Sequence, residues 1–156
     1  MSKSVLFVCF GNHCRSTMAE AIFLDLIRKS GEEYQWKVDS AGLGTWHLGK
    51  TPEPRTLQVL AQRGIVGYTH IARLITGEDY FNFQYILGMD DYNLRMLREF
   101  KPGMSEATIK VLGDYDPQGE RVIFDPYFSN NIEAYEEVYR QCLRCCKSFL
   151  REVSTS

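Results

Sequence analysis

The chain has 156 residues, of which 44% are hydrophobic and 24% are charged. This composition is ordinary for a soluble globular domain, and it excludes collagen-like, disordered and disulfide-scaffold proteins. The formal net charge is −2, which argues against wholesale binding to nucleic acid or to anionic lipid. The longest purely apolar run covers only residues 5–10, whereas a membrane span needs ~20 residues. We therefore expect one domain over residues 1–156, with no nucleic-acid partner and no membrane insertion.

Five cysteines occur in the chain, at positions 9, 14, 142, 145 and 146. An odd number in a chain of this length does not indicate a disulfide framework, so we expect free thiols in a reducing compartment. The apolar stretch near the N-terminus is too short for a secretory signal and has no small-residue cleavage site after it. These features predict a cytoplasmic protein.

Predicted strands and helices alternate along the chain. Strands are predicted from apolar, β-prone runs, and helices from apolar residues that recur every three or four positions. In chain order they are a strand over 4–10, a helix over 16–29, a strand over 34–40, a helix over 54–63, a short ordered stretch over 72–75, a strand over 85–89, a helix over 90–100, a strand over 108–112 and a long helix over 132–153. This alternation predicts an α/β fold with a central parallel sheet, where ligands bind beyond the carboxyl ends of the strands. The glycine-rich loop over 41–52 is longer than packing requires, which is typical of functional loops.

The loop after the first strand reads Cys9-Phe10-Gly11-Asn12-His13-Cys14-Arg15-Ser16 and leads directly into a helix. Inward-pointing N–H groups of such a loop, together with the helix N-terminus, form an anion-binding nest. Arg15 adds a planar fork that matches two oxygens of a phosphate. Cys9 is expected at the bottom of the nest, where the positive field favours the nucleophilic thiolate. The loop is therefore predicted to hold a phosphate group that sulfur attacks.

Two further residues of this loop have expected roles. Ser16 either caps the helix or donates its hydroxyl to the sulfur of Cys9. Gly11 is expected to let the backbone turn with positive φ. The alternative for the whole loop is structural, with Cys9 as a small buried strand residue and Arg15 as a surface charge at the helix start.

Attack by sulfur expels an oxyanion, so turnover needs a proton donor. The candidate carboxylates are Asp39, Asp90, Asp91, Asp114, Asp116 and Asp125. Asp125 is favoured because Pro126 restricts its backbone to an extended or turn conformation. Tyr127 and Phe128 follow it, and two aromatic side chains on a loop would grip a flat leaving group. The alternative is an ordinary turn before the last helix, with both aromatic residues in the core.

With both segments considered, the chain resembles the low-molecular-weight protein tyrosine phosphatases over nearly its whole length. The segments that carry the resemblance are residues 5–16 with Met18-Ala19-Glu20-Ala21, Val38-Asp39-Ser40-Ala41-Gly42, His70-Ile71-Ala72-Arg73, Ile86-Leu87-Gly88-Met89-Asp90, Asn93-Leu94-Arg95 and Asp125-Pro126-Tyr127. The resemblance implies a central four-stranded parallel sheet flanked on both faces by helices, with a phosphate-binding loop between the first strand and the first helix. It also implies that no metal and no organic cofactor is used.

The resemblance implies a mechanism and a set of site residues. Cys9 would form a phosphocysteine, Arg15 would clamp the phosphoryl oxygens, and Asp125 would act first as general acid and then as general base. Substrates would be phosphotyrosine-containing proteins or peptides and small aryl phosphates, with inorganic phosphate as product. Cys14 would form a protective disulfide with Cys9 under oxidation. The residues that bind phosphate or support the loop would be Phe10, Gly11, Asn12, His13, Cys14, Ser16, Ser40 and His70, and those that wall the cleft would be Trp46, His47, Tyr127 and Phe128.

Four positions depart from the family pattern. Phe10 replaces a common Leu, His13 an aliphatic residue, Thr17 a common proline, and Phe128 a common second Tyr. We expect His13 to be a solvated residue at the rim of the cleft. The alternative is that it adds positive charge for acidic substrates below about pH 6.5.

An arsenate reductase is the nearest enzyme alternative, because it shares this fold and loop. Its disulfide cascade needs further resolving cysteines, and none occurs between Cys14 and Cys142. We expect Cys142 and Cys145 to pack in the core on the apolar side of the last helix. Together with Cys146 they also lack a second ligand pair for a metal.

A phosphate-binding module without turnover is an alternative from a different class. The joint presence of Cys9, Arg15 and Asp125 argues against it. A papain-like cysteine hydrolase is disfavoured as well. It needs a histidine base and a residue that orients this base, and the sequence around the three histidines shows no such arrangement. We expect a monomer, with weak self-association through the exposed aromatic residues of the cleft.

Overall fold

The computed structural model describes residues 3–154, so the first and last two residues of the expected 1–156 domain lie outside the description. Within these residues four parallel strands form one sheet in the order β2-β1-β3-β4. Their bounds are β1 Lys3–Cys9, β2 Trp36–Gly42, β3 Tyr85–Gly88 and β4 Thr108–Val111. The predicted α/β fold with a central four-stranded parallel sheet is confirmed.

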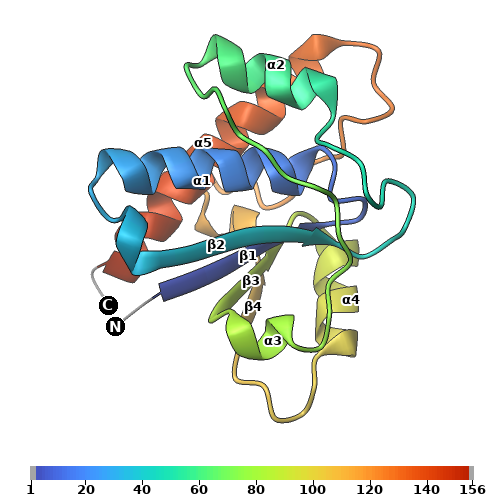
Figure 1. The fold of residues 1–156 in the computed structure, drawn as a ribbon, viewed down its shortest axis with the longest axis vertical. Helices are drawn as coiled ribbons and strands as arrows, with labels where there is room; N and C mark the ends of the chain where they lie inside the picture. The colour runs from blue at the N-terminus through green and yellow to red at the C-terminus, as the bar shows by residue number, and fades with distance from the viewer. Residues whose placement is uncertain (1–2, 155–156) are drawn as a thin grey trace.

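Helices cover both faces of the sheet (Figure 1). On one face lie α1 (Arg15–Lys29), α2 (Pro54–Gln62) and the long α5 (Ile132–Ser154). On the other face lie the short α3 (Asp79–Asn82) and α4 (Asp91–Phe100). None of the described helices is both long and apolar enough to cross a membrane.

The first strand is buried on both of its faces. Val5 and Phe7 point into the core beneath α1 and α5, whereas Leu6 and Val8 point into the core on the α3 and α4 side. Strands of parallel sheets that are covered by helices on both faces have continuous apolar sequences instead of alternating ones. Cys9 ends this strand on the α1 side, so its side chain starts from a buried position.

The observed elements differ from the predicted ones in two respects. The second strand begins at Trp36 and not at Tyr34, because residues Glu33–Gln35 form a single 3-10 turn. Trp36 packs edge-on against Phe23 at 4.8 Å between ring centroids, whereas Tyr34 is exposed. Helix α3 and a 3-10 turn over Leu112–Tyr115 were not predicted, since four-residue helices are too short to show a helical period.

The carboxyl ends of all four strands meet at one edge of the sheet. Strand β1 is the switch point, because its neighbours β2 and β3 are reached by connections that run in opposite directions. The segments that leave this edge are residues 10–14, 43–53, 89–90 and 112–131. A short ordered stretch was predicted over 72–75. In the structure it forms an isolated parallel bridge, between Leu74 and Gly42. The predicted loop therefore lies where parallel α/β sheets bind ligands.

Candidate active site

The cysteine loop (residues 9–16) joins the end of β1 to the start of α1. Cys9 is only 3% exposed, and Cys14 occupies the N-cap position of the helix without a side-chain capping bond. The left-handed residue of the loop is Asn12, with φ of 51°. The expectation that Gly11 supplies the positive φ is therefore wrong. Gly11 is required for space instead, because a Cβ there would lie 2.8 Å from Cδ2 of His47.

Hydrogen bonds from distant segments hold Asn12 in this conformation. Its Oδ1 accepts from the backbone N–H of Arg73 at 3.0 Å and from Nε2 of His70 at 2.8 Å. Its Nδ2 donates to the hydroxyls of Ser16 at 2.9 Å and Ser40 at 3.0 Å. The supporting residues expected from the resemblance thus converge on one amide behind the loop. This arrangement stabilises a backbone conformation that is uncommon outside glycine.

Ser16 lies next to the sulfur of Cys9, with Oγ and Sγ 3.0 Å apart. Of the two roles expected for Ser16, the geometry favours the contact with sulfur, because α1 has no side-chain cap. Cys14 also lines the cavity of Cys9 and is 4% exposed, with its sulfur 3.6 Å from the hydroxyl of Tyr135.

Arg15 is buried at the floor of the site, and fixed acceptors orient its guanidinium. Its Nη1 donates to Oδ2 of Asp90 at 2.7 Å and to the carbonyl of Ile123 at 2.8 Å. Burial acts to lower the pKa of Arg15, but the nearby Cys9, Asp90 and Asp125 raise it above its ordinary value. The cation therefore keeps its charge and its direction. The sequence suggested Asp90 only as a candidate proton donor, and its place directly after β3 was the available signal for this partnership.

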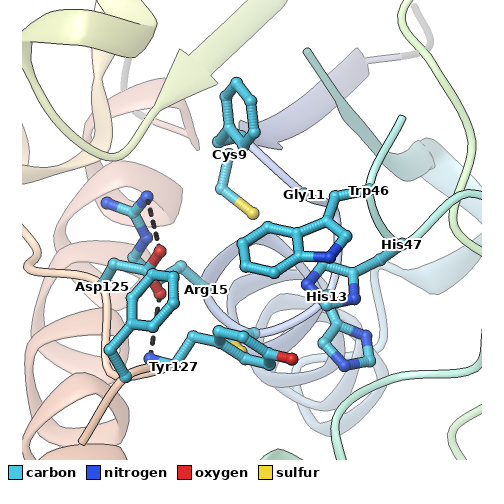
Figure 2. Close-up of a pocket in the computed structure, with 11 residues that line it drawn as sticks. Cys9, Gly11, His13, Arg15, Trp46, His47, Asp125 and Tyr127 are labelled. Atoms are coloured by element: carbon cyan, nitrogen blue, oxygen red, sulfur yellow. Dashed lines mark hydrogen bonds and ion pairs between the residues drawn. The ribbon is translucent and has the colours of Figure 1, made fainter. Parts of the chain in front are cut away.

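Asp125 enters the site from the loop over residues 125–131, which precedes α5. Its carboxylate accepts from the backbone N–H of Tyr127 at 3.1 Å and lies 3.8 Å from Nη2 of Arg15. Figure 2 shows the Cys9 sulfur pointing into the space bordered by Arg15, Asp125 and Trp46. The three residues expected to carry the chemistry therefore meet, although Asp125 is more than 100 positions away from the cysteine loop in the chain.

These side chains line a cavity of about 210 Å³ that opens at the carboxyl edge of the sheet. Trp46 packs at 5.5 Å against Tyr127 and at 5.7 Å against Phe128, measured between ring centroids. The cavity is lined by Cys9, Phe10, Gly11, His13, Cys14, Arg15, Trp46, His47, Asp125, Tyr127 and Phe128. All four expected wall residues are among them, whereas the expected supporting residues Asn12, Ser16, Ser40 and His70 do not line the cavity.

His13 is a wall residue and not a solvated rim residue as expected. Its ring stacks on His47 with centroids 3.9 Å apart, and Trp46 stacks on the other face of His47 at 5.1 Å. Among the described residues 3–154, none is a hydrogen-bond partner for the buried Nδ1 atoms of these two histidines. Burial lowers the pKa of His13, and the neighbouring His47 lowers it further. Burial also lowers the pKa of His47, so both stacked histidines are neutral at pH 7.

A cluster of Glu20, Asp39 and His70 behind the cysteine loop is the group of potential metal ligands found in residues 3–154. The hydroxyls of Ser40 and Tyr68 both donate to Oε1 of Glu20 at 2.6 Å. Burial raises the pKa of Glu20 to about 7. Internal donors thus already occupy this carboxylate, and its role is to anchor Ser40. Glu20 has no role among the sequence-based expectations, although a glutamate on the buried face of a helix was a usable signal.

The loop between β1 and α1 lies at the switch point of a parallel sheet, which is where α/β proteins of this class bind their ligands. A family model described as low molecular weight phosphotyrosine protein phosphatase matches residues 4–156. The relative of that name from Rattus norvegicus is 46% identical over 153 residues, which cover 97% of this chain and 96% of the relative. The chain belongs to the low molecular weight phosphotyrosine protein phosphatase family.

Solved structures agree with this assignment. A protein tyrosine phosphatase from Entamoeba histolytica, crystallised with Hepes in its active site, has a TM-score of 0.93 at 28% identity and covers 99% of this chain and 98% of its own. DARP, described as a drosophila arginine phosphatase, has a TM-score of 0.90 at 38% identity and covers 96% of each chain. The overall fold is thus shared with proteins named for different phosphorylated residues.

Proposed function

We propose that this protein hydrolyses phosphotyrosine in proteins and peptides, as well as small aryl phosphates, and releases inorganic phosphate. The observation that carries the proposal is the meeting of Cys9, Arg15 and Asp125 in one cavity, with the Arg15 guanidinium 3.8 Å from the Asp125 carboxylate. A nucleophile, a fixed cation for the phosphoryl oxygens and a carboxyl group for proton transfer are what phosphoryl transfer to sulfur requires.

In the first step the thiolate of Cys9 attacks phosphorus, and the bond between phosphorus and the phenolic oxygen breaks. Asp125 gives its proton to the departing oxygen, so that a neutral phenol leaves. Arg15 and the N–H groups at the start of α1 bind the phosphoryl oxygens. Because Arg15 is already oriented by Asp90 and Ile123, little reorganisation is needed during the reaction.

In the second step Asp125, now ionised, takes a proton from a water molecule that attacks the phosphocysteine. The bond between sulfur and phosphorus breaks, phosphate leaves, and the thiolate of Cys9 is restored. Ser16 is placed to donate its hydroxyl to the departing sulfur, since the two atoms are 3.0 Å apart. The proton taken from water replaces the one that Asp125 gave in the first step, and the cycle closes.

The depth of the site supports an aromatic substrate. Cys9 is 3% exposed at the floor, whereas Trp46 at the lip is 57% exposed. A phosphate at the floor must be carried by a side chain long enough to pass the walls, and a tyrosine ring fits between aromatic side chains. A phosphoserine side chain is shorter, so we expect phosphoserine to be the poorer substrate.

The alternatives have less support. An arsenate reductase needs thiols that can exchange disulfides. Cys142, Cys145 and Cys146 belong to α5, and all three are fully buried in the core. A binding module without turnover does not require Asp125 beside Arg15. A cytoplasmic location stays our prediction, because a cysteine nucleophile must be kept reduced. A monomer with weak self-association through Trp46, Tyr127 and Phe128 also stays a prediction; of the three, Trp46 and Phe128 are exposed and Tyr127 is half-buried.

The test compares the wild-type protein with Cys9→Ser on a phosphotyrosine peptide, a phosphoserine peptide and a phosphoarginine peptide. The third substrate is included because DARP is named an arginine phosphatase. We expect release of phosphate from phosphotyrosine by the wild type, none by the variant, and retained binding of inorganic phosphate by the variant. Normal turnover by Cys9→Ser would overturn the mechanism, and faster release from phosphoarginine would overturn the substrate class.

A further inference from the structure

The first turn of α2 is bound to the end of the cysteine loop. The backbone N–H of Glu53, the N-cap residue of α2, donates to the carbonyl of His13 at 3.0 Å. One turn later, the hydroxyl of Thr56 donates to the carbonyl of Cys14 at 3.3 Å. Glu53 and Thr56 are both buried. The start of α2 therefore has a fixed position relative to the proposed nucleophile loop.

The same turn is also bound to the 125–131 loop, through Arg55. Its Nη1 donates to the carbonyl of Ser129 at 2.6 Å, and its Nη2 donates to the carbonyl of Tyr127 at 3.1 Å. In Figure 1 the segment that precedes α5 passes beside the start of α2. The two loops that carry Cys9 and Asp125 are thus connected through a single short piece of helix.

The guanidinium of Arg55 is fixed on its remaining sides. Its Nε donates to Oε1 of Glu53 at 2.9 Å, and its plane lies over the ring of Tyr135 at 4.5 Å from the centroid. The side chain is 30% exposed. A planar fork that is held at Nε and stacked on a ring presents its two terminal nitrogens in one direction only. That direction is toward the 125–131 loop.

The 125–131 loop packs against Trp46 through Tyr127 and Phe128, but few hydrogen bonds reach it from the rest of the protein. Within residues 3–154, Arg55 supplies the only side-chain hydrogen bonds from outside the loop to the carbonyls of residues 125–130. Asp125 itself is exposed, and its carboxylate accepts from the loop's own Tyr127 N–H. A proton donor that is off its productive position by even ~1 Å loses much of its effect.

We propose that Arg55 is a positioning residue, which sets the place of Asp125 relative to Cys9 by tying the 125–131 loop to the first turn of α2. This inference rests on the proposed function, in which Asp125 protonates the leaving group. Arg55 contacts neither the substrate nor the reacting atoms. Its loss therefore affects the step in which the proton is transferred and leaves the capture of phosphate intact.

The experiment measures kcat/KM of Arg55→Ala with phenyl phosphate, whose leaving group is poor, and with p-nitrophenyl phosphate, whose leaving group is good. We expect a loss of about 10- to 100-fold with phenyl phosphate, by analogy with other small misplacements of catalytic groups. We expect a much smaller loss with p-nitrophenyl phosphate, since a good leaving group needs less protonation. Binding of inorganic phosphate should be unchanged.

Arg63→Ala is the matched control. Arg63 lies at the other end of α2 and stacks over Tyr139 at 4.7 Å from the ring centroid, but it makes no bond to the 125–131 loop. We expect its kcat/KM to match the wild type with both substrates. Arg55→Lys keeps the charge but not the fork, so it should show the same dependence on the leaving group. If Arg55→Ala does not fold, Arg55→Lys decides the test.

A second readout separates positioning from general stability. In an Asp125→Asn background, Arg55→Ala should cause little further loss, because a residue that acts through Asp125 has nothing left to position. An equal loss with both substrates, or an additive loss in the double variant, would overturn the proposal. If Asp125→Asn itself shows no dependence on the leaving group, the proposed acid is wrong. If Asp125→Asn shows this dependence on the leaving group and the Arg55 variants do not, the role of Arg55 is wrong and the proposed function stands.

Discussion

The hydroxyl of Ser16 lies 3.0 Å from the sulfur of Cys9 and accepts a hydrogen bond from Nδ2 of Asn12 at 2.9 Å. An amide nitrogen can only donate, so the single hydroxyl proton of Ser16 remains for the sulfur. Asn12 in turn is held by Arg73 and His70, which belong to the segment before α3. The direction of one proton at the nucleophile is thus determined by a chain of bonds that reaches across the carboxyl edge of the sheet.

We predict that Ser16→Ala slows hydrolysis of the phosphocysteine more than its formation. The departing thiolate would lose a hydrogen bond to a charged group, which contributes about 1.5–3 kcal/mol. This loss corresponds to about 10- to 100-fold in rate. Rapid-quench measurements should show phosphoenzyme accumulating in the variant. Ser105→Ala, which removes a buried hydroxyl on the α3 side, should not accumulate it, and an unchanged kcat in Ser16→Ala would contradict the prediction.

The parts of the molecule that the sequence predicted well are those fixed by local pattern. The last helix, predicted over 132–153, is observed over Ile132–Ser154, because its apolar side repeats over many turns. The cysteine loop was predicted for the same reason, as a buried strand, a polar turn and a helix follow one another directly. Cys142 and Cys145, expected in the core, are fully buried there.

The parts that the sequence did not predict depend on contacts between distant residues. Arg15 and Asp90 are 75 positions apart, and Arg55 and Ser129 are 74 apart, so no local pattern connects them. The left-handed residue was assigned to Gly11 on intrinsic preference, but remote hydrogen bonds stabilise that conformation at Asn12 instead. Local propensity is a weak guide where tertiary bonds over-determine the backbone.

We predict that Glu20 makes the protein less stable as the pH rises from about 4.5 to 7. Burial raises the pKa of Glu20 to about 7, whereas an unfolded glutamate titrates near the ordinary value of 4.5. In this window the folded state holds one proton more than the unfolded state, so the free energy of unfolding falls with rising pH. Above the window the carboxyl group is charged in both states and its effect on the slope ends.

Glu20→Gln keeps an oxygen that can accept from Ser40 and Tyr68 but no longer titrates. Denaturant unfolding at a series of pH values should therefore show a weaker fall in stability for Glu20→Gln than for the wild type. Glu33→Gln changes an exposed carboxylate and serves as the control, with the wild-type slope expected. Parallel curves for Glu20→Gln and the wild type would contradict the prediction.

We predict that His47→Asn raises the pKa of His13 toward its ordinary value. Burial lowers the pKa of His13 first, and the adjacent His47 lowers it further, so removal of that ring relieves both effects. The chain has three histidines, which makes a proton NMR titration straightforward to resolve. Because folding lowers the pKa of this histidine, the free energy of unfolding of the protein decreases as the pH falls below about 6.5. The variant should show less of this loss, and an unmoved His13 titration would refute the coupling.

We predict that one equivalent of hydrogen peroxide links Cys9 to Cys14. The Cys9 thiolate would take oxygen from peroxide to give a sulfenic acid, and the Cys14 thiol would then displace water to form the disulfide. Burial raises the pKa of the Cys14 thiol, so the attacking thiolate is scarce and the second step is the slower one.

Mass spectrometry of the wild type should show the link, and a reductant should restore activity. Cys14→Ser should instead accumulate sulfinic or sulfonic acid at Cys9, whereas Cys145→Ala, a change in the core beneath α5, should behave as the wild type. Sulfonic acid at Cys9 of the wild type, without a link, would show that Cys14 gives no protection.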